Sequence, residues 1–91
     1  MIHMDQTADI KKNLKTKKLV VGTKQTLKNL KLGKLEKVFV TANCPESVKK
    51  DVAHYSSLSG CEVQSLDIPN EELGTICKKQ FAISVLGLLR S

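Results

Sequence analysis

The sequence predicts an α/β fold, namely a three-layer α/β/α sandwich around a central four-stranded mixed sheet. Three observations support this prediction. Short apolar segments alternate with amphipathic ones, glycines and prolines separate them, and 91 residues with 41% hydrophobic content can form one core but not two. We therefore expect residues 1–91 to form a single domain with helices on both faces of one sheet.

The N-terminal third predicts a basic helix and a short strand. Thr7 can cap a helix that carries Ile10 and Leu14 at i and i+4, with lysines on the opposite side. The apolar triplet at 19–21 predicts a short buried strand, which ends at Gly22.

The middle of the chain predicts a second helix and a second strand. Residues 23–32 place Leu27 and Leu30 at helical spacing, and Gly33 predicts the end of that helix. The Val-Phe-Val segment at 38–40 predicts a strand.

A third helix is expected after this strand. Asn43 or Cys44 can cap it, because Pro45 suits the first helical position. Gly60 predicts its end. Its buried face is expected to comprise Val48, Val52 and Tyr55.

The C-terminal third predicts a strand, a helix and a last strand. Residues 61–66 form the weaker strand, and Pro69 and Asn70 open the helix. Residues 82–89 predict the last strand. One face of the helix should carry Leu73, Ile76 and Cys77.

The distribution of charge favours a polyanionic partner. The net charge is +6, and ten lysines but only one acid, Glu36, lie between residues 11 and 37. For any single lysine, a solvated helix surface is the simpler explanation. Lys24, Lys28 and Lys31 nevertheless recur on one side of the second predicted helix, where like charges repel unless an anion is bound. Nucleic acid is the leading candidate.

The turn at Gly22 is a possible phosphate site. Glycine allows close approach of a ligand to the backbone, and free N–H groups at a helix start attract anions. For the glycine alone, a tight turn is the better explanation.

Several other classes of function lack support. The sequence contains no nucleotide-binding glycine loop, and its three cysteines have no metal-site or disulfide spacing. Cys44 is a remote candidate nucleophile, but nothing in the sequence places His54 beside it, and Glu71 and Glu72 suit a helix start better than acid–base catalysis. We expect no enzyme activity, no cofactor, no metal and no membrane span, in a soluble protein of a reducing compartment.

Five segments of the chain form a recognisable set, namely Gly22 to Lys28 (GTKQTLK), Gly33-Lys34, Asn43-Cys44-Pro45, Tyr55 with Leu58, and Asn70 to Thr75 (NEELGT) with Cys77 and Lys79. Taken together, these segments resemble the L-thirty-e branch of the kink-turn-binding ribosomal protein family, which also includes the L-seven-Ae, S-twelve-e and Gadd-forty-five types. They follow the family's order between about Leu14 and Leu88.

The resemblance implies a structural component of the large ribosomal subunit. It would grip a kink-turn or similar bent internal loop of ribosomal RNA and lie beside neighbouring ribosomal proteins, in the cytoplasm. The alternative within the family is a kink-turn protein of a small ribonucleoprotein, acting with guide RNA or in RNase P. By position, the RNA contacts would be Gly22, Thr23, Lys24, Gln25 and Lys28 in a first segment, Asn43 in a second, and Lys79, Gln80, Phe81 and Ile83 in a third.

The chain departs from the family pattern in the last of these segments. Lys78 stands where the family usually has glycine, and Ala82 follows Phe81 where arginine is common. We therefore expect this loop to hold RNA somewhat differently. Phe81 itself should lie partly exposed there, and Lys24 and Asn43 should lie at the same end of the sheet.

Overall fold

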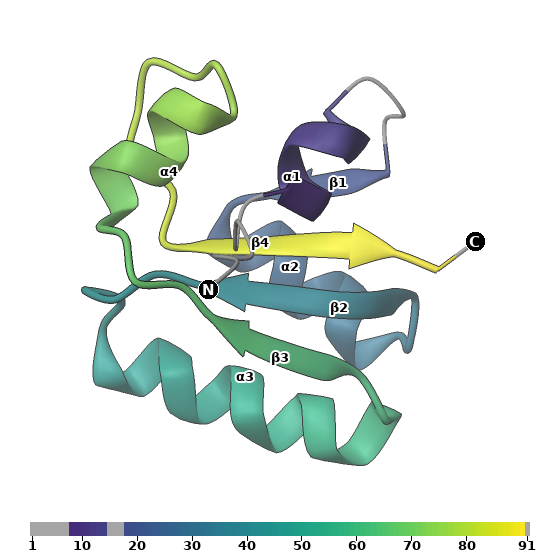
Figure 1. Ribbon diagram of the computed structural model, residues 1–91. Coiled ribbons are helices and arrows are strands. Elements are labelled where there is room, and N and C mark those ends of the chain that lie inside the picture. Colours follow the sequence, from purple (N-terminus) through teal and green to yellow (C-terminus); the bar gives the residue numbers. More distant parts are fainter. Residues whose placement is uncertain (1–7, 15–17, 91) are drawn as a thin grey trace, which may run out of the picture.

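The computed structural model describes residues 8–14 and 18–90, so the predicted cap Thr7 lies outside the described residues. Four helices and four strands alternate within that part of the chain (Figure 1). In order they are α1 (Ala8–Asn13), β1 (Leu19–Val21), α2 (Thr23–Lys31), β2 (Leu35–Val40), α3 (Glu46–Ser59), β3 (Glu62–Ser65), α4 (Asn70–Ile76) and β4 (Val85–Leu89).

The strands form one mixed sheet in the order β1-β4-β2-β3. β4 runs antiparallel to both β1 and β2, whereas β2 and β3 are parallel. The predicted four-stranded mixed sheet is confirmed. Gly87 in β4 permits close packing, since a Cβ atom there would lie only 2.8 Å from Leu35 Cδ1 and 3.2 Å from Thr26 Cγ2 of α2.

Each face of the sheet carries its own hydrophobic core, as strand alternation requires. On one face, Leu30 of α2 and Val52 of α3 pack against β2 and β4. On the other, Ile10 of α1 and Leu73 of α4 pack around Phe39. Helices therefore cover both faces, and the three-layer prediction is confirmed. Within the described ranges, no helix is long and apolar enough to cross a membrane.

Some predicted strand bounds and burials were wrong. β1 is half-buried rather than buried, because it lies at the edge of the sheet. β2 begins three residues earlier than predicted, at Leu35. β4 begins at Val85, so residues 82–84 precede the strand instead of forming its start. These differences arise from pairing partners that are distant in sequence.

The predicted cap of the third helix was also wrong. Pro45 itself occupies the N-cap of α3, and no side chain caps that helix. Asn43 instead accepts a hydrogen bond from the backbone N–H of Asn70, the first residue of α4, at 2.8 Å. The predicted stop of α3 at Gly60 is confirmed, with φ of 70°.

Helices α2, α3 and α4 all end with the same reversal of the backbone, in which a residue with positive φ follows the helix. The residue is Gly33 in α2 and Gly60 in α3, but Lys78 in α4, with φ of 60°. In α4 the Lys79 N–H donates to Gly74 O at 2.9 Å and the Lys78 N–H donates to Thr75 O at 3.0 Å. Lys78 is therefore a lysine in a conformation that favours glycine.

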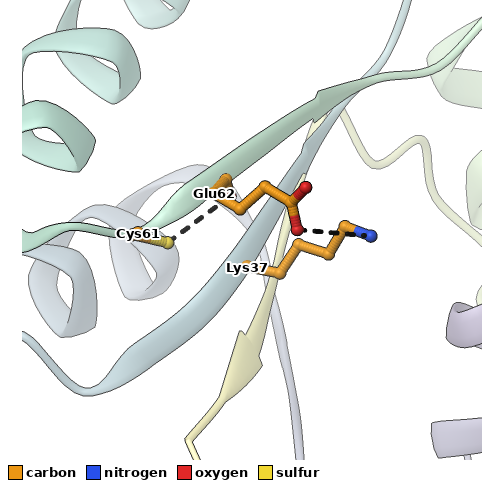
Figure 2. A network of polar contacts seen from close by, with 3 residues as sticks. All are labelled: Lys37, Cys61 and Glu62. Carbon is orange, nitrogen blue, oxygen red and sulfur yellow. Dashed lines mark hydrogen bonds and ion pairs between the residues drawn. The ribbon is translucent and has the colours of Figure 1, made fainter.

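Two hydrogen bonds from one side chain connect the C-terminal ends of helices α2 and α3. The single arginine, Arg90, donates from its guanidinium to Gly33 O and to Ser59 O, each at 3.1 Å. Cationic donors at helix C-termini complement the helix dipoles, so Arg90 ties the two ends together. Nearby, Lys37 of β2 pairs with its register partner Glu62 of β3 at 3.7 Å, beside Cys61 (Figure 2).

We expect the substitution Lys78→Gly to stabilise the protein. Glycine removes the Cβ clash of the left-handed conformation, so the free energy of unfolding should rise by about 1 kcal/mol in urea titrations. Lys79→Gly is the matched control, because it removes a neighbouring exposed lysine. Equal changes in the two variants would show that the φ of Lys78 carries no strain.

Candidate nucleic-acid interface

One end of the sheet collects the segments that the sequence predicted as contacts. β1 and β2 both finish there, and β4 begins there (Figure 1). The Gly22 N–H donates to Val85 O at 3.3 Å, and the Thr41 N–H donates to Ser84 O at 3.0 Å. The three predicted segments therefore meet, and the expected shared location of Lys24 and Asn43 at this end is confirmed.

The first segment is the turn from β1 into α2. Gly22 has φ of 101° and ψ of 151°, a region that only glycine adopts without strain. As the N-cap it offers no side-chain oxygen, and the first turn of α2 contains no acid. The N–H groups of that turn therefore lack a side-chain cap, and the side chains of Lys24, Gln25 and Lys28 beside them are exposed. This turn can receive an anion.

The second segment is the exit of β2, where two asparagines form a joint. Asn43 Oδ1 accepts hydrogen bonds from the Asn70 N–H and, at 3.3 Å, from the Thr41 hydroxyl. Asn43 Nδ2 donates to Asn70 Oδ1 at 3.2 Å, and Asn70 Nδ2 donates to Ser84 Oγ at 3.1 Å. We call Thr41, Asn43, Asn70 and Ser84 the asparagine joint, because it connects the exit of β2, the start of α4 and the approach to β4.

The third segment is the loop between α4 and β4. Phe81 has 59% of its surface exposed, which confirms its predicted exposure. The loop and α4 border an open, shallow hollow of about 340 Å³. Its described lining consists of Glu71, Thr75, Lys79, Gln80, Phe81 and Ala82. Gly74 explains the close fit of the loop, since a Cβ atom there would collide with the Phe81 carbonyl oxygen.

The structure adds residues to the predicted set and removes one side chain from it. Ile83 is 1% exposed and packs with Phe39 and Leu73, so its side chain is not available to a ligand. Sequence reasoning missed Asn70 in the joint, and Thr75 with Glu71 in the hollow. Thr75 and Glu71 are four residues apart on α4, and that spacing was the available signal.

The buried cysteines lack the features of a reactive nucleophile. Burial raises the pKa of the Cys44 thiol, and Lys49 only partly offsets this effect. Burial also raises the pKa of Cys61 and of Cys77. All three thiols are therefore protonated at neutral pH, whereas nucleophilic cysteines have a lowered pKa. Across residues 8–14 and 18–90, no three His, Cys, Asp or Glu side chains form a candidate metal site.

Comparison with known proteins finds one family over nearly the whole chain. The pattern of the ribosomal protein L7Ae/L30e/S12e/Gadd45 family matches residues 4–90. The large ribosomal subunit protein eL30 of Methanococcus vannielii is 38% identical over 86 residues, covering 94% of this chain and 82% of the relative. The eL30B protein of Schizosaccharomyces pombe is 38% identical over 76 residues, covering 84% of this chain and 65% of the relative.

A solved structure agrees with the fold. The Giardia lamblia 15.5kD RNA binding protein superposes with a TM-score of 0.74 at 19% sequence identity. The match covers 90% of this chain and 68% of the Giardia protein. At 19% identity, this similarity shows that the two proteins share the arrangement of helices and strands.

We expect Asn43→Ala to destabilise the protein through the asparagine joint. The Asn70 N–H loses its acceptor, so the free energy of unfolding in urea should fall by about 1 kcal/mol. Asn43→Asp is the matched control, because it keeps that acceptor and adds a negative charge near the start of α4. Equal losses in the two variants would contradict the capping role.

Proposed function

Because the chain belongs to the ribosomal protein L7Ae/L30e/S12e/Gadd45 family, we propose that it is a structural component of the large ribosomal subunit that binds a kink-turn or similarly bent internal loop of ribosomal RNA. One observation carries the proposal. Lysines, an asparagine joint and an exposed phenylalanine, far apart in sequence, meet at one end of the sheet.

The turn from β1 into α2 would neutralise phosphates. A bent RNA crowds its phosphates, and backbone N–H groups at a helix start together with lysine ammonium groups suit them. The exposed side chains of Lys24 and Lys28 supply charge, and Gly22 and Thr23 supply the backbone turn. These contacts set position on the RNA and carry no base information.

Asn43 and Gln25 would read exposed base edges or sugars. Asn43 is exposed, and one of the two N–H groups of its side-chain amide donates a hydrogen bond within the asparagine joint. The second N–H group can donate a hydrogen bond to RNA while the asparagine joint holds the side chain in place. Asn43 therefore has both a structural role and a proposed recognition role.

The loop before β4 would cover a base splayed from the bend. Phe81 offers an aromatic surface, and Lys79 and Gln80 stand beside it with charge and hydrogen-bonding groups. Unpaired bases stack on such surfaces without strong sequence preference. The shape of the RNA would do most of the selecting.

The proposed cellular location is inferred from the relatives, which are named large ribosomal subunit proteins. We propose the same place for this chain: the cytoplasmic ribosome, in contact with ribosomal RNA and with neighbouring ribosomal proteins. The proposal requires no catalysis. The raised pKa of Cys44 also argues against the rival role as a cysteine-dependent enzyme.

The direct test compares RNAs of different shape. The purified protein should bind a kink-turn RNA more tightly than a duplex of equal length, because splayed bases and crowded phosphates exist only in the bend. Both affinities should fall as salt rises. Filter binding at several salt concentrations measures this, and equal affinity for the two RNAs throughout would refute recognition of shape.

We expect Phe81→Ala to weaken kink-turn binding without unfolding the protein. Loss of a stacking surface costs about 1–3 kcal/mol of binding free energy, whereas an exposed ring contributes little to stability. Leu58→Ala is the control, since Leu58 is 73% exposed on α3, away from the proposed RNA contacts. A lowered melting temperature with intact RNA affinity in Phe81→Ala would assign Phe81 to the fold.

A further inference from the structure

The outward side of α2 carries a groove that the proposed RNA contacts do not explain. Its volume is about 400 Å³, and its described lining is Lys24, Leu27, Lys28, Lys31 and Leu32. Leu32 has 59% of its surface exposed, and Leu27 is only partly buried. The groove therefore has an apolar floor and a rim made of lysines.

The rim is held partly by a neighbouring helix. Lys31 Nζ lies 4.9 Å from the centre of the Tyr55 ring on α3, and the His54 ring meets Tyr55 edge-on at a centroid distance of 5.1 Å. A cation over an aromatic face is attracted to it. Lysine side chains can extend an apolar floor with their hydrocarbon stems while their ammonium groups remain at its margin.

RNA is a poor occupant for such a groove. Phosphates need charge but gain nothing from leucine side chains, and the described lining contains no aromatic ring on which a base can stack. It also has no side-chain acceptor to read the donor groups of a base. The groove suits a ligand that is apolar on one side and negatively charged at its margins.

We propose that this groove binds an acidic amphipathic helix of a protein partner. From Lys24 to Leu32 the groove follows α2 for about 12 Å, which is about two turns of a partner helix. Two leucines of the partner, four residues apart, would pack on Leu27 and Leu32. Glutamates on either side would meet Lys24, Lys28 and Lys31.

This inference goes beyond the proposed function, because it gives the chain a protein-binding surface next to its RNA-binding end. Lys24 and Lys28 belong to both surfaces. Lys31 and Leu32, near the other end of α2, belong to the groove alone. Leu32 is therefore the residue with which to separate the two activities.

The test uses a fluorescent peptide of about 20 residues, long enough for helix formation, with leucines four residues apart and flanking glutamates. Anisotropy should show binding to the wild-type protein. Leu32→Ser should weaken it about tenfold by removing apolar contact. Leu58→Ser is the matched control, as an exposed leucine near the end of α3 and outside the groove, and it should leave the affinity unchanged.

Four results would overturn the proposal. They are absence of peptide binding, equal effects of Leu32→Ser and Leu58→Ser, equal binding of a peptide with lysines in place of the glutamates, and loss of kink-turn affinity in Leu32→Ser. The last would assign the groove to RNA. Failure of the wild-type protein to bind kink-turn RNA would instead refute the proposed function and leave the peptide result standing.

Discussion

The candidate interface depends on the asparagine joint. The joint connects the exit of β2, the start of α4 and the approach to β4 by hydrogen bonds, which act together with the packing of Ile83 on Phe39 and Leu73. Asn43 satisfies the first N–H of α4, which would otherwise lack a partner from its own helix. One side chain thus orients α4, and α4 in turn supports the loop that carries Phe81.

The loop that carries Phe81 also depends on the end of α4. Gly74 lets the Phe81 carbonyl pack directly on the helix, and Lys78 turns the chain back in a left-handed conformation. The sequence resemblance predicts glycine where Lys78 stands, and a φ of 60° is a conformation that glycine adopts without strain. This chain gains a further positive charge beside the proposed RNA contacts at a cost in backbone strain.

The sequence predicted what local patterns determine. Apolar spacing gave the type and order of all eight elements, and Gly33 and Gly60 ended their helices as expected. Prediction from the sequence failed where a residue's contact partner lies far away along the chain. Asn43 precedes Pro45 and was therefore assigned to α3, yet it caps α4, whose first residue lies 27 positions away.

Contacts made only in the folded chain also decided two other parts of the candidate interface, the side chain of Ile83 and the hollow beside Phe81. Ile83 was predicted as an RNA contact from its position in the family resemblance, but its side chain packs with Phe39 of β2. The hollow beside Phe81 combines α4 with the loop, so its lining required the folded structure. The resemblance to a family predicted all three segments of the candidate interface, whereas reasoning from the residues alone predicted the lysines of α2 and the turn at Gly22.

The central place of β4 has a consequence for how the protein is made. During translation β1, β2, α3 and β3 emerge before the strand that joins β1 to β2. β2, α3 and β3 form a local unit that can begin to fold early, whereas β1 and one side of β2 must wait with unpaired backbone groups. Until β4 leaves the exit tunnel, these unpaired strand edges are open to mispairing with other chains.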